Sequence, residues 1–236
     1  MSSYYHISKR LMKEDLQVID EYIALIKNRE LRSKVEELLH DPKIAFNDVR
    51  LPIQECPAGA YVHHSYKGGL VEHTVAVVRL AITLCDIVSE VYEGRIDRDT
   101  VIAGAILHDV MKCYVYTLQE NGRYANSELG EKIDHLTLLV AELYKRGFPL
   151  EVLHVAASHH GDQSPIKPKT LEALVVSLAD LTDSELNRNV LRAAEYLAKS
   201  ATGKDVRLTS KEAMEIVKAK SEGGLEGVRR LIKGEK

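Results

Sequence analysis

The chain has 236 residues, of which 45% are hydrophobic and 28% are charged, and its formal net charge is −3 at pH 7. This is the composition of an ordinary globular protein, and it lacks the overall basic excess of proteins that bind nucleic acid through charge alone. No run of about 18 apolar residues occurs, which argues against a membrane-spanning helix and a membrane partner.

The cysteines and the start of the chain indicate the compartment. Cys56, Cys85 and Cys113 are odd in number and form no CxxC pair, so they suggest no disulfide framework. The first residues lack the apolar core of a signal peptide. We therefore expect a cytoplasmic protein.

Hydrophobic periodicity is helical along most of the chain. It predicts helices at residues 14–28, 30–40, 70–92, 100–111, 129–146, 149–160, 170–186, 189–202, 210–221 and 224–233. Tyr114–Leu118 and Arg123–Ala125, separated by Asn121-Gly122, predict a short β-hairpin. The expected fold class is all-α: a helical bundle with one small hairpin near 114–125.

The charge distribution divides the chain. Residues 187–236 hold 12 Lys/Arg against 7 Asp/Glu, so the acidic surplus lies in residues 1–186. A basic tail could steer an anionic substrate, although a solvated helical face explains it equally. We expect one main domain over residues 1–186, including the N-terminal helices, and a helical extension over 187–236 packed on the same domain.

Five histidines and two aspartates in a fixed order are the most informative feature. Imidazole and carboxylate are ligands that borderline divalent metals prefer. The set comprises His73, His108, Asp109, His135, His159, His160 and Asp180. A single histidine on an apolar helix face is as readily a core residue, but adjacent His-Asp and His-His pairs in one set make coincidence a poor explanation.

The helical positions of these residues favour convergence. His73 stands one turn before Val77 on an apolar stripe, and Asp180 follows Val176 by four residues. An unpaired buried carboxylate costs several kcal/mol, so Asp109 and Asp180 need cations or several donors. Metal ions would satisfy both the carboxylates and the imidazoles.

The series His73…His108-Asp109…Asp180 resembles the H…HD…D signature of the HD phosphohydrolase superfamily, an all-α family of metal-dependent hydrolases. The three further histidines of the set resemble the pattern of its two-metal members, such as HD-GYP cyclic-dinucleotide phosphodiesterases.

A narrower resemblance covers roughly residues 25–185. The stretches PAGAYVHHSYKGGLVEHTVAVVRLA, AGAILHDVMK and SHHGDQSPIKPKTLEALVVSLAD are similar to the HD domain of YhaM-type 3′–5′ exoribonucleases. Because only about 25 residues precede this region, we expect the oligonucleotide-binding barrel of those enzymes to be absent. Met111 stands where HDxGK motifs usually have glycine, which predicts a different turn after the His-Asp pair.

The resemblance implies two divalent metal ions with Asp109 as the bridging, catalytic carboxylate. One ion would be held by His73, His108, Asp109 and Asp180, and the other by Asp109, His135, His159 and His160. A hydroxide between the ions would be the nucleophile, because two cations lower the pKa of a bridging water and stabilise the attacking and leaving oxygens. The ligands suit Mn, Fe, Co, Ni or Zn, and the sequence does not choose among them.

Three further residues are candidates for binding the substrate. Lys112, which we also count with Asp109 as a catalytic residue, follows Asp109 by three residues and could bind a phosphate, or it could be a lysine that extends to the surface. Lys67 precedes Gly68-Gly69 at the entry to a helix, where N–H groups favour anions. His64, like its neighbour His63, could protonate a leaving alkoxide or line the cleft, or it could pack within the loop.

The function that we expect is divalent-metal-dependent hydrolysis of a phosphate ester. We rank a phosphodiesterase or 3′–5′ exonuclease-like activity on RNA or oligonucleotides first, and a nucleotide phosphomonoesterase second. A non-catalytic nucleotide-binding sensor and a di-iron oxygenase remain as alternatives. The sequence leaves the oligomeric state open, a homo-oligomer included.

Overall fold

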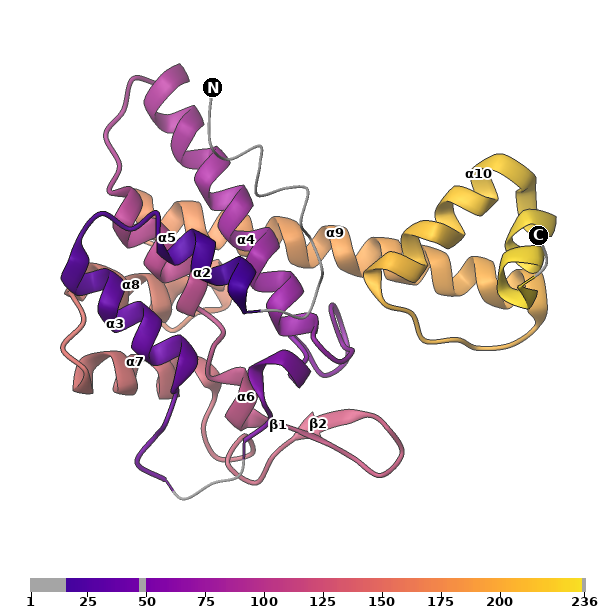
Figure 1. Cartoon of the computed structure of the whole chain (residues 1–236), viewed down its shortest axis with the longest axis horizontal. Coiled ribbons are helices and arrows are strands. Elements are labelled where there is room, and N and C mark those ends of the chain that lie inside the picture. The colour runs from indigo at the N-terminus through magenta and orange to yellow at the C-terminus, as the bar shows by residue number, and fades with distance from the viewer. Residues whose placement is uncertain (1–15, 47–49, 235–236) are drawn as a thin grey trace.

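The structure is a computed structural model that describes residues 16–46 and 50–234. Within these residues the chain is mainly helical and its one sheet has two strands, which confirms the all-α fold class (Figure 1). None of the helices in the described part has both the length and the apolar character needed to cross a bilayer.

The N-terminal helices are α2 (Gln17–Ile23) and α3 (Arg29–His40). The prediction of one helix over 14–28 is wrong at its end, and residues 14 and 15 lie outside the described residues. The helix stops early because a distant partner binds the following backbone: the N–H groups of Lys27 and Asn28 donate to the Asp99 carboxylate over 3.0 and 2.7 Å. Asn28 then caps α3 by accepting from the Leu31 N–H.

Much of the core of the main body lies between four helices. These are α4 (Gly69–Asp86), extended by a π-helical turn at Ile87–Val91, then α5 (Arg98–Leu107), α8 (Leu150–Ser158) and the first half of α9 (Leu171–Thr202). Gly104 lets α5 approach α8 closely, since a Cβ there would lie 2.5 Å from Val155 Cγ1. Most of their facing side chains are fully buried.

A hairpin follows the short helix α6 (Lys112–Val115). Strands β1 (Tyr116–Leu118) and β2 (Tyr124–Asn126) pair antiparallel, which confirms the predicted hairpin. Helix α7 (His135–Lys145) begins six residues later than predicted, because Asp134 caps it by accepting from the Thr137 N–H over 2.7 Å. Two 3-10 turns, Ile53–Glu55 and Gly161–Gln163, complete the body.

Helix α9 runs unbroken for 32 residues, so the prediction of separate helices at 170–186 and 189–202 is wrong. The polar segment around Asn187 contains no glycine or proline that would stop a helix. Asn189 bonds back to the Glu185 carbonyl over 2.7 Å, within the same helix. Asn187 reaches outward, accepting from the His64 N–H and donating to Ser210 Oγ.

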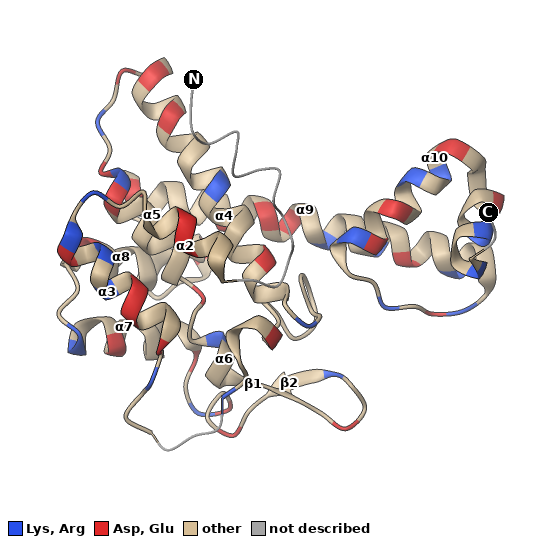
Figure 2. Cartoon of the chain, viewed as in Figure 1, with Lys and Arg blue, Asp and Glu red and all other residues tan. Residues whose placement is uncertain are grey.

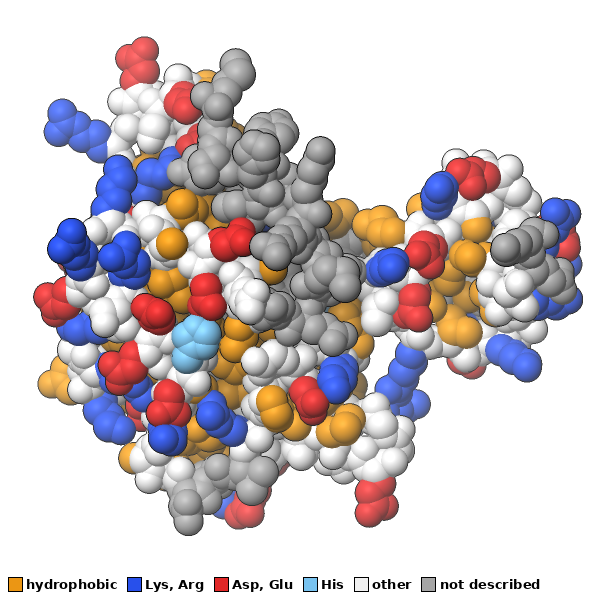
Figure 3. Space-filling model, viewed as in Figure 1, with side chains coloured by type: hydrophobic (Ala, Val, Ile, Leu, Met, Phe, Trp, Pro, Cys, Tyr) orange, Lys and Arg blue, Asp and Glu red, His pale blue; other side chains and the backbone are white. Residues whose placement is uncertain are grey.

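The C-terminal helix α10 (Ser210–Lys233) bends at Gly223 and Gly224, whose backbone is not helical. It folds back on the C-terminal half of α9, to the side of the main body (Figure 1), and forms a second apolar cluster there. The boundary expected at 186/187 therefore falls inside a continuous helix, and the division into domain and extension stays a prediction. Lys/Arg and Asp/Glu intermix on both parts (Figures 2 and 3).

Candidate metal centre

Helix α4 presents His73 to the interior because of how the helix begins. Gly68 takes the left-handed conformation, with φ of 79°, just before the helix. At Gly69 a Cβ would lie 2.1 Å from the His64 carbonyl oxygen, so only glycine permits this close crossing. His73 follows in the first turns of α4 and is fully buried.

Most of the other candidate ligands stand at helix ends. The helices predicted over 100–111 and 149–160 stop earlier, at Leu107 and Ser158, so the His-Asp and His-His pairs occupy the turns that follow. Met111 lies in the first of these turns with φ of −77°, a conformation open to any residue, and its side chain is buried in the core. His135 starts α7, and Asp180 comes from within α9.

One group of candidate ligands surrounds His73. Its Nε2 lies 3.1 Å from His108 Nε2, 3.2 Å from Asp180 Oδ1 and 3.4 Å from Asp109 Oδ2. Atoms that share one ion with bonds of about 2.1 Å stand about 3.0–3.4 Å apart. The spacing of these side chains therefore fits a single cation.

A second group surrounds the other oxygen of Asp109. Asp109 Oδ1 lies 3.2 Å from His135 Nε2 and 3.7 Å from His159 Nε2. With His160, these residues each offer an atom within 4.8 Å of the others. Asp109 thus faces one group with each carboxylate oxygen, as a bridging ligand would.

Four polar atoms at the centre lack a hydrogen-bond partner. These buried atoms are the two Asp109 oxygens, His135 Nε2 and His159 Nε2. Lys112 Nζ nevertheless lies 2.5 Å from Asp109 Oδ2 as an ion-pair partner. A buried polar atom left in this state costs about 1–3 kcal/mol. Divalent cations would remove this cost at all four atoms, so the residues fit a metal centre.

Hydrogen bonds to the far side of three imidazoles orient the rings. His108 Nδ1 donates to the Ala105 carbonyl over 2.9 Å, and His159 Nδ1 donates to the Ala156 carbonyl over 2.8 Å. A carbonyl can only accept, so Nδ1 carries the hydrogen and Nε2 faces the centre as a ligand atom. His73 Nδ1 donates in the same way to Asp183 Oδ2 over 2.7 Å.

Burial and charge set the protonation of the site. Burial lowers the pKa of His135 to about 4 and that of His160 to about 3, which keeps both imidazoles neutral for metal binding. Burial also lowers the pKa of His73, but the neighbouring carboxylates of Asp109, Asp180 and Asp183 outweigh it and raise that pKa well above its usual value.

The Lys112 and Asp109 side chains hold each other charged. Burial opposes both charges, yet the nearby carboxylate raises the pKa of Lys112. Lys112 and His108 in turn hold the pKa of Asp109 well below its usual value. A cation and a carboxylate therefore persist side by side in the interior.

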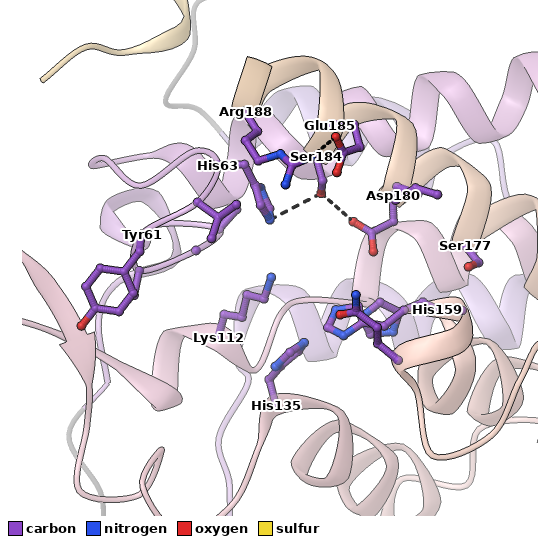
Figure 4. Close-up of a pocket in the computed structure, with 18 of the residues that line it drawn as sticks. Tyr61, His63, Lys112, His135, His159, Ser177, Asp180, Ser184, Glu185 and Arg188 are labelled. Carbon is purple, nitrogen blue, oxygen red and sulfur yellow. Dashed lines mark hydrogen bonds and ion pairs between the residues drawn. The ribbon is translucent and has the colours of Figure 1, made fainter. Parts of the chain in front are cut away.

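A cavity of about 620 Å³ opens onto the centre. Figure 4 shows His63, Ser184 and Arg188 on one side of it, and Lys112 and His135 on the other. His159, His160 and Asp180 also line the cavity, whereas His73, His108 and Asp109 lie beneath its surface.

The three predicted substrate-binding residues lie in different surroundings. Lys112 lines the cavity. His64 is buried behind it, with Nε2 3.7 Å from Asp183 Oδ2, and its neighbour His63 lines the cavity instead. Lys67 is not among the lining residues, and its Nζ pairs with Glu55 over 2.9 Å.

Two residues of α9 that line the cavity beside Asp180 were not predicted from the sequence. Ser184 and Arg188 follow Asp180 at intervals of four residues and line the same cavity. The signal was this i, i+4, i+8 spacing, which becomes visible only when α9 is read as one helix.

Comparison with known proteins places the chain in a family. The model of the HD domain family matches residues 70–185. The chain is 43% identical over 195 residues to a dihydroneopterin 2′,3′-cyclic phosphate phosphodiesterase of Methanocaldococcus jannaschii, an alignment that covers 81% of this chain and 76% of that protein. The chain belongs to the HD domain family.

Other relatives are 3′–5′ exoribonucleases. The chain is 31% identical over 192 residues to the 3′–5′ exoribonuclease YhaM of Listeria monocytogenes, covering 77% of this chain and 56% of that protein. The YhaM of Bacillus subtilis is 28% identical over 185 residues, with 74% and 54% covered. The chain thus spans little more than half the length of these exoribonucleases. Comparison with solved structures finds no match.

Membership in the family confirms the resemblance seen in the sequence. It also confirms the expected class of activity: the chain is a metal-dependent phosphohydrolase. The candidate ligand groups around Asp109 are consistent with that dependence.

Proposed function

We propose that this HD domain protein is a phosphodiesterase that opens a 2′,3′-cyclic phosphate on a small molecule. The observation that carries the proposal is the pair of ligand groups sharing Asp109 beside a cavity of about 620 Å³. Cavities of about 300–1,000 Å³ are typical of small-molecule sites. The 43% identity to a cyclic-phosphate phosphodiesterase supports this substrate class.

Two divalent ions would be held by the seven candidate ligands. His73, His108 and Asp180 would hold one, His135, His159 and His160 would hold the other, and Asp109 would bridge them. When bound, such ions activate a water and stabilise charge on the phosphate. Mn, Fe, Co, Ni and Zn all suit these ligands.

The reaction consumes one water. Its oxygen forms a new bond to phosphorus, one ring P–O bond breaks, and the freed oxygen takes a proton to become a hydroxyl. Lys112, held charged beside Asp109, would bind a phosphate oxygen and offset its negative charge. His63 lines the cavity with a neutral imidazole, since burial lowers its pKa to about 3, and could hydrogen-bond the substrate.

A second candidate function is removal of nucleotides from an RNA 3′ end. It is favoured by the exoribonuclease relatives and by Tyr61, which lines the cavity with 75% of its surface exposed and could stack on a base. Hydrolysis of nucleoside monophosphates would use the same centre.

The test compares three substrates on the metal-loaded protein: a nucleoside 2′,3′-cyclic phosphate, a labelled RNA oligonucleotide and a nucleoside monophosphate. We expect the cyclic phosphate to have the highest kcat/KM. Asp109→Ala should abolish turnover, whereas Asp205→Ala, at an exposed carboxylate paired with Lys199, should leave it unchanged. Full activity in Asp109→Ala, or turnover of RNA alone, would contradict the proposal.

A further inference from the structure

Arg188 lies on the wall of the cavity that helix α9 forms. Asp180, Ser184 and Arg188 occupy one face of α9 and all line the cavity. Eight residues of helix span about 12 Å, and helical side chains lean toward the helix N-terminus. The guanidinium is therefore directed back toward Ser184 and Asp180, and Figure 4 shows it beside Ser184 and His63.

The guanidinium is anchored but not fully paired. Glu185, one turn earlier, forms an ion pair with it through a short contact, and Glu185 also accepts from Asn189 Nδ2 over 3.3 Å. Arg188 Nε is buried and has no hydrogen-bond partner. Arginine carries five N–H donors in a planar fork, so the anchored group keeps donors for a ligand.

Arg188 and Lys112 are the cavity's two cationic side chains among the described residues. Each has a carboxylate beside it, Asp109 for Lys112 and Glu185 for Arg188, so part of each charge is already offset. Arg188 stands on the opposite side (Figure 4) and offers the geometry that binds two oxygens of one phosphate.

We propose that Arg188 is a substrate-binding residue whose guanidinium binds the phosphate of the substrate from the side opposite Lys112. The proposal rests on the proposed phosphodiesterase function and adds a specificity-determining contact to it. Glu185 orients the guanidinium, and Ser184 links the same wall to Asp180 through a 3.2 Å hydrogen bond. An anionic ester would then be held between two cations.

Kinetics of Arg188→Gln and Arg188→Lys test this contact, with Arg192→Gln, an exposed arginine one turn farther along α9, as the matched control. We expect Arg188→Gln to raise KM about 10- to 100-fold, the effect of losing a hydrogen bond to a charged group. Arg188→Lys should recover part of the loss, because it keeps the charge without the fork. An unchanged KM in Arg188→Gln would overturn the proposal.

Two substrates separate phosphate binding from recognition of a base. The loss in Arg188→Gln should be equal for a nucleoside 2′,3′-cyclic phosphate and for glycerol 1,2-cyclic phosphate, which has no base. A loss confined to the nucleoside would overturn the assignment, since Arg188 would then contact the base.

Binding of inorganic phosphate to the Mn²⁺-loaded protein gives a readout without turnover. Calorimetry should show at least a tenfold weaker affinity in Arg188→Gln than in the wild type, at equal metal content and equal Tm. Equal affinities, or no binding by the wild type, would overturn the proposal. If the wild type hydrolyses no cyclic phosphate but binds phosphate through Arg188, the proposed function fails and this inference stands.

Discussion

Replacing Asp183 by asparagine should weaken one metal site and spare the other. Asp183 Oδ2 accepts from His73 Nδ1 over 2.7 Å and is buried, whereas His135 and His159 of the other group lie against Asp109 instead. The carboxylate fixes the ring and makes its Nε2 a stronger ligand. An amide oxygen keeps the geometry and removes the charge.

The expected loss of metal affinity follows from the single hydrogen bond between Asp183 and His73. A hydrogen bond to a charged partner contributes about 1.5–3 kcal/mol, and each 1.4 kcal/mol is tenfold in affinity. Metal affinity at the site that includes His73 should therefore fall about 10- to 100-fold, the range seen for such outer partners.

Competition with a chromogenic chelator would resolve the two affinities. Asp205→Asn removes an exposed carboxylate and should bind metal like the wild type. If Asp183→Asn bound metal at both sites with wild-type affinity, Asp183 would not support the site that includes His73. An equal loss of affinity at both sites would also contradict this role.

Three more predictions follow from the same geometry. Lys112→Met should lower kcat/KM for the cyclic phosphate about 100-fold, since it removes the charge facing the phosphate; steady-state kinetics at matched metal content check this, and an unchanged value would contradict the role of Lys112. Gly104→Ala should lower the free energy of unfolding by about 1–3 kcal/mol, because its Cβ would lie 2.5 Å from Val155 Cγ1. Gly223→Ala, where a Cβ meets nothing within 4 Å, is the control in urea denaturation, and equal midpoints would count against the packing described. Chelation with EDTA should lower Tm, since ligands at 1,000 times their Kd stabilise by about 4 kcal/mol each; an unchanged Tm would show that the buried unpartnered atoms need no metal.

The fold class and most helices could be predicted from local periodicity, but several helix ends could not. The helix that begins at Gln17 stops at Ile23 because Asp99, far along the chain, binds the backbone of Lys27 and Asn28. The start of α7 depends on the cap at Asp134 rather than on its apolar pattern. Such ends are decided by individual hydrogen bonds, which hydrophobic spacing does not report.

The candidate site shows the same division. The order of histidines and aspartates identified a set whose ligand atoms lie together, because each side chain sits on a buried face or at the end of a core helix. Arg188 and Ser184 were missed because a helix break was predicted near Asn187, which removed the spacing that relates them to Asp180. Lys67 was predicted to bind substrate because it precedes Gly68-Gly69. In the structure, glycine is needed at position 69 because the backbone there passes close to the His64 carbonyl.

Counting the bound metal ions tests whether Asp109 bridges two sites. We expect two divalent ions per chain in the wild-type protein, measured by elemental analysis after reconstitution and desalting. Asp109→Asn should weaken both sites together, because Asp109 faces both ligand groups. One ion per chain in the wild type, or an Asp109→Asn protein that still holds two, would contradict a centre bridged by Asp109.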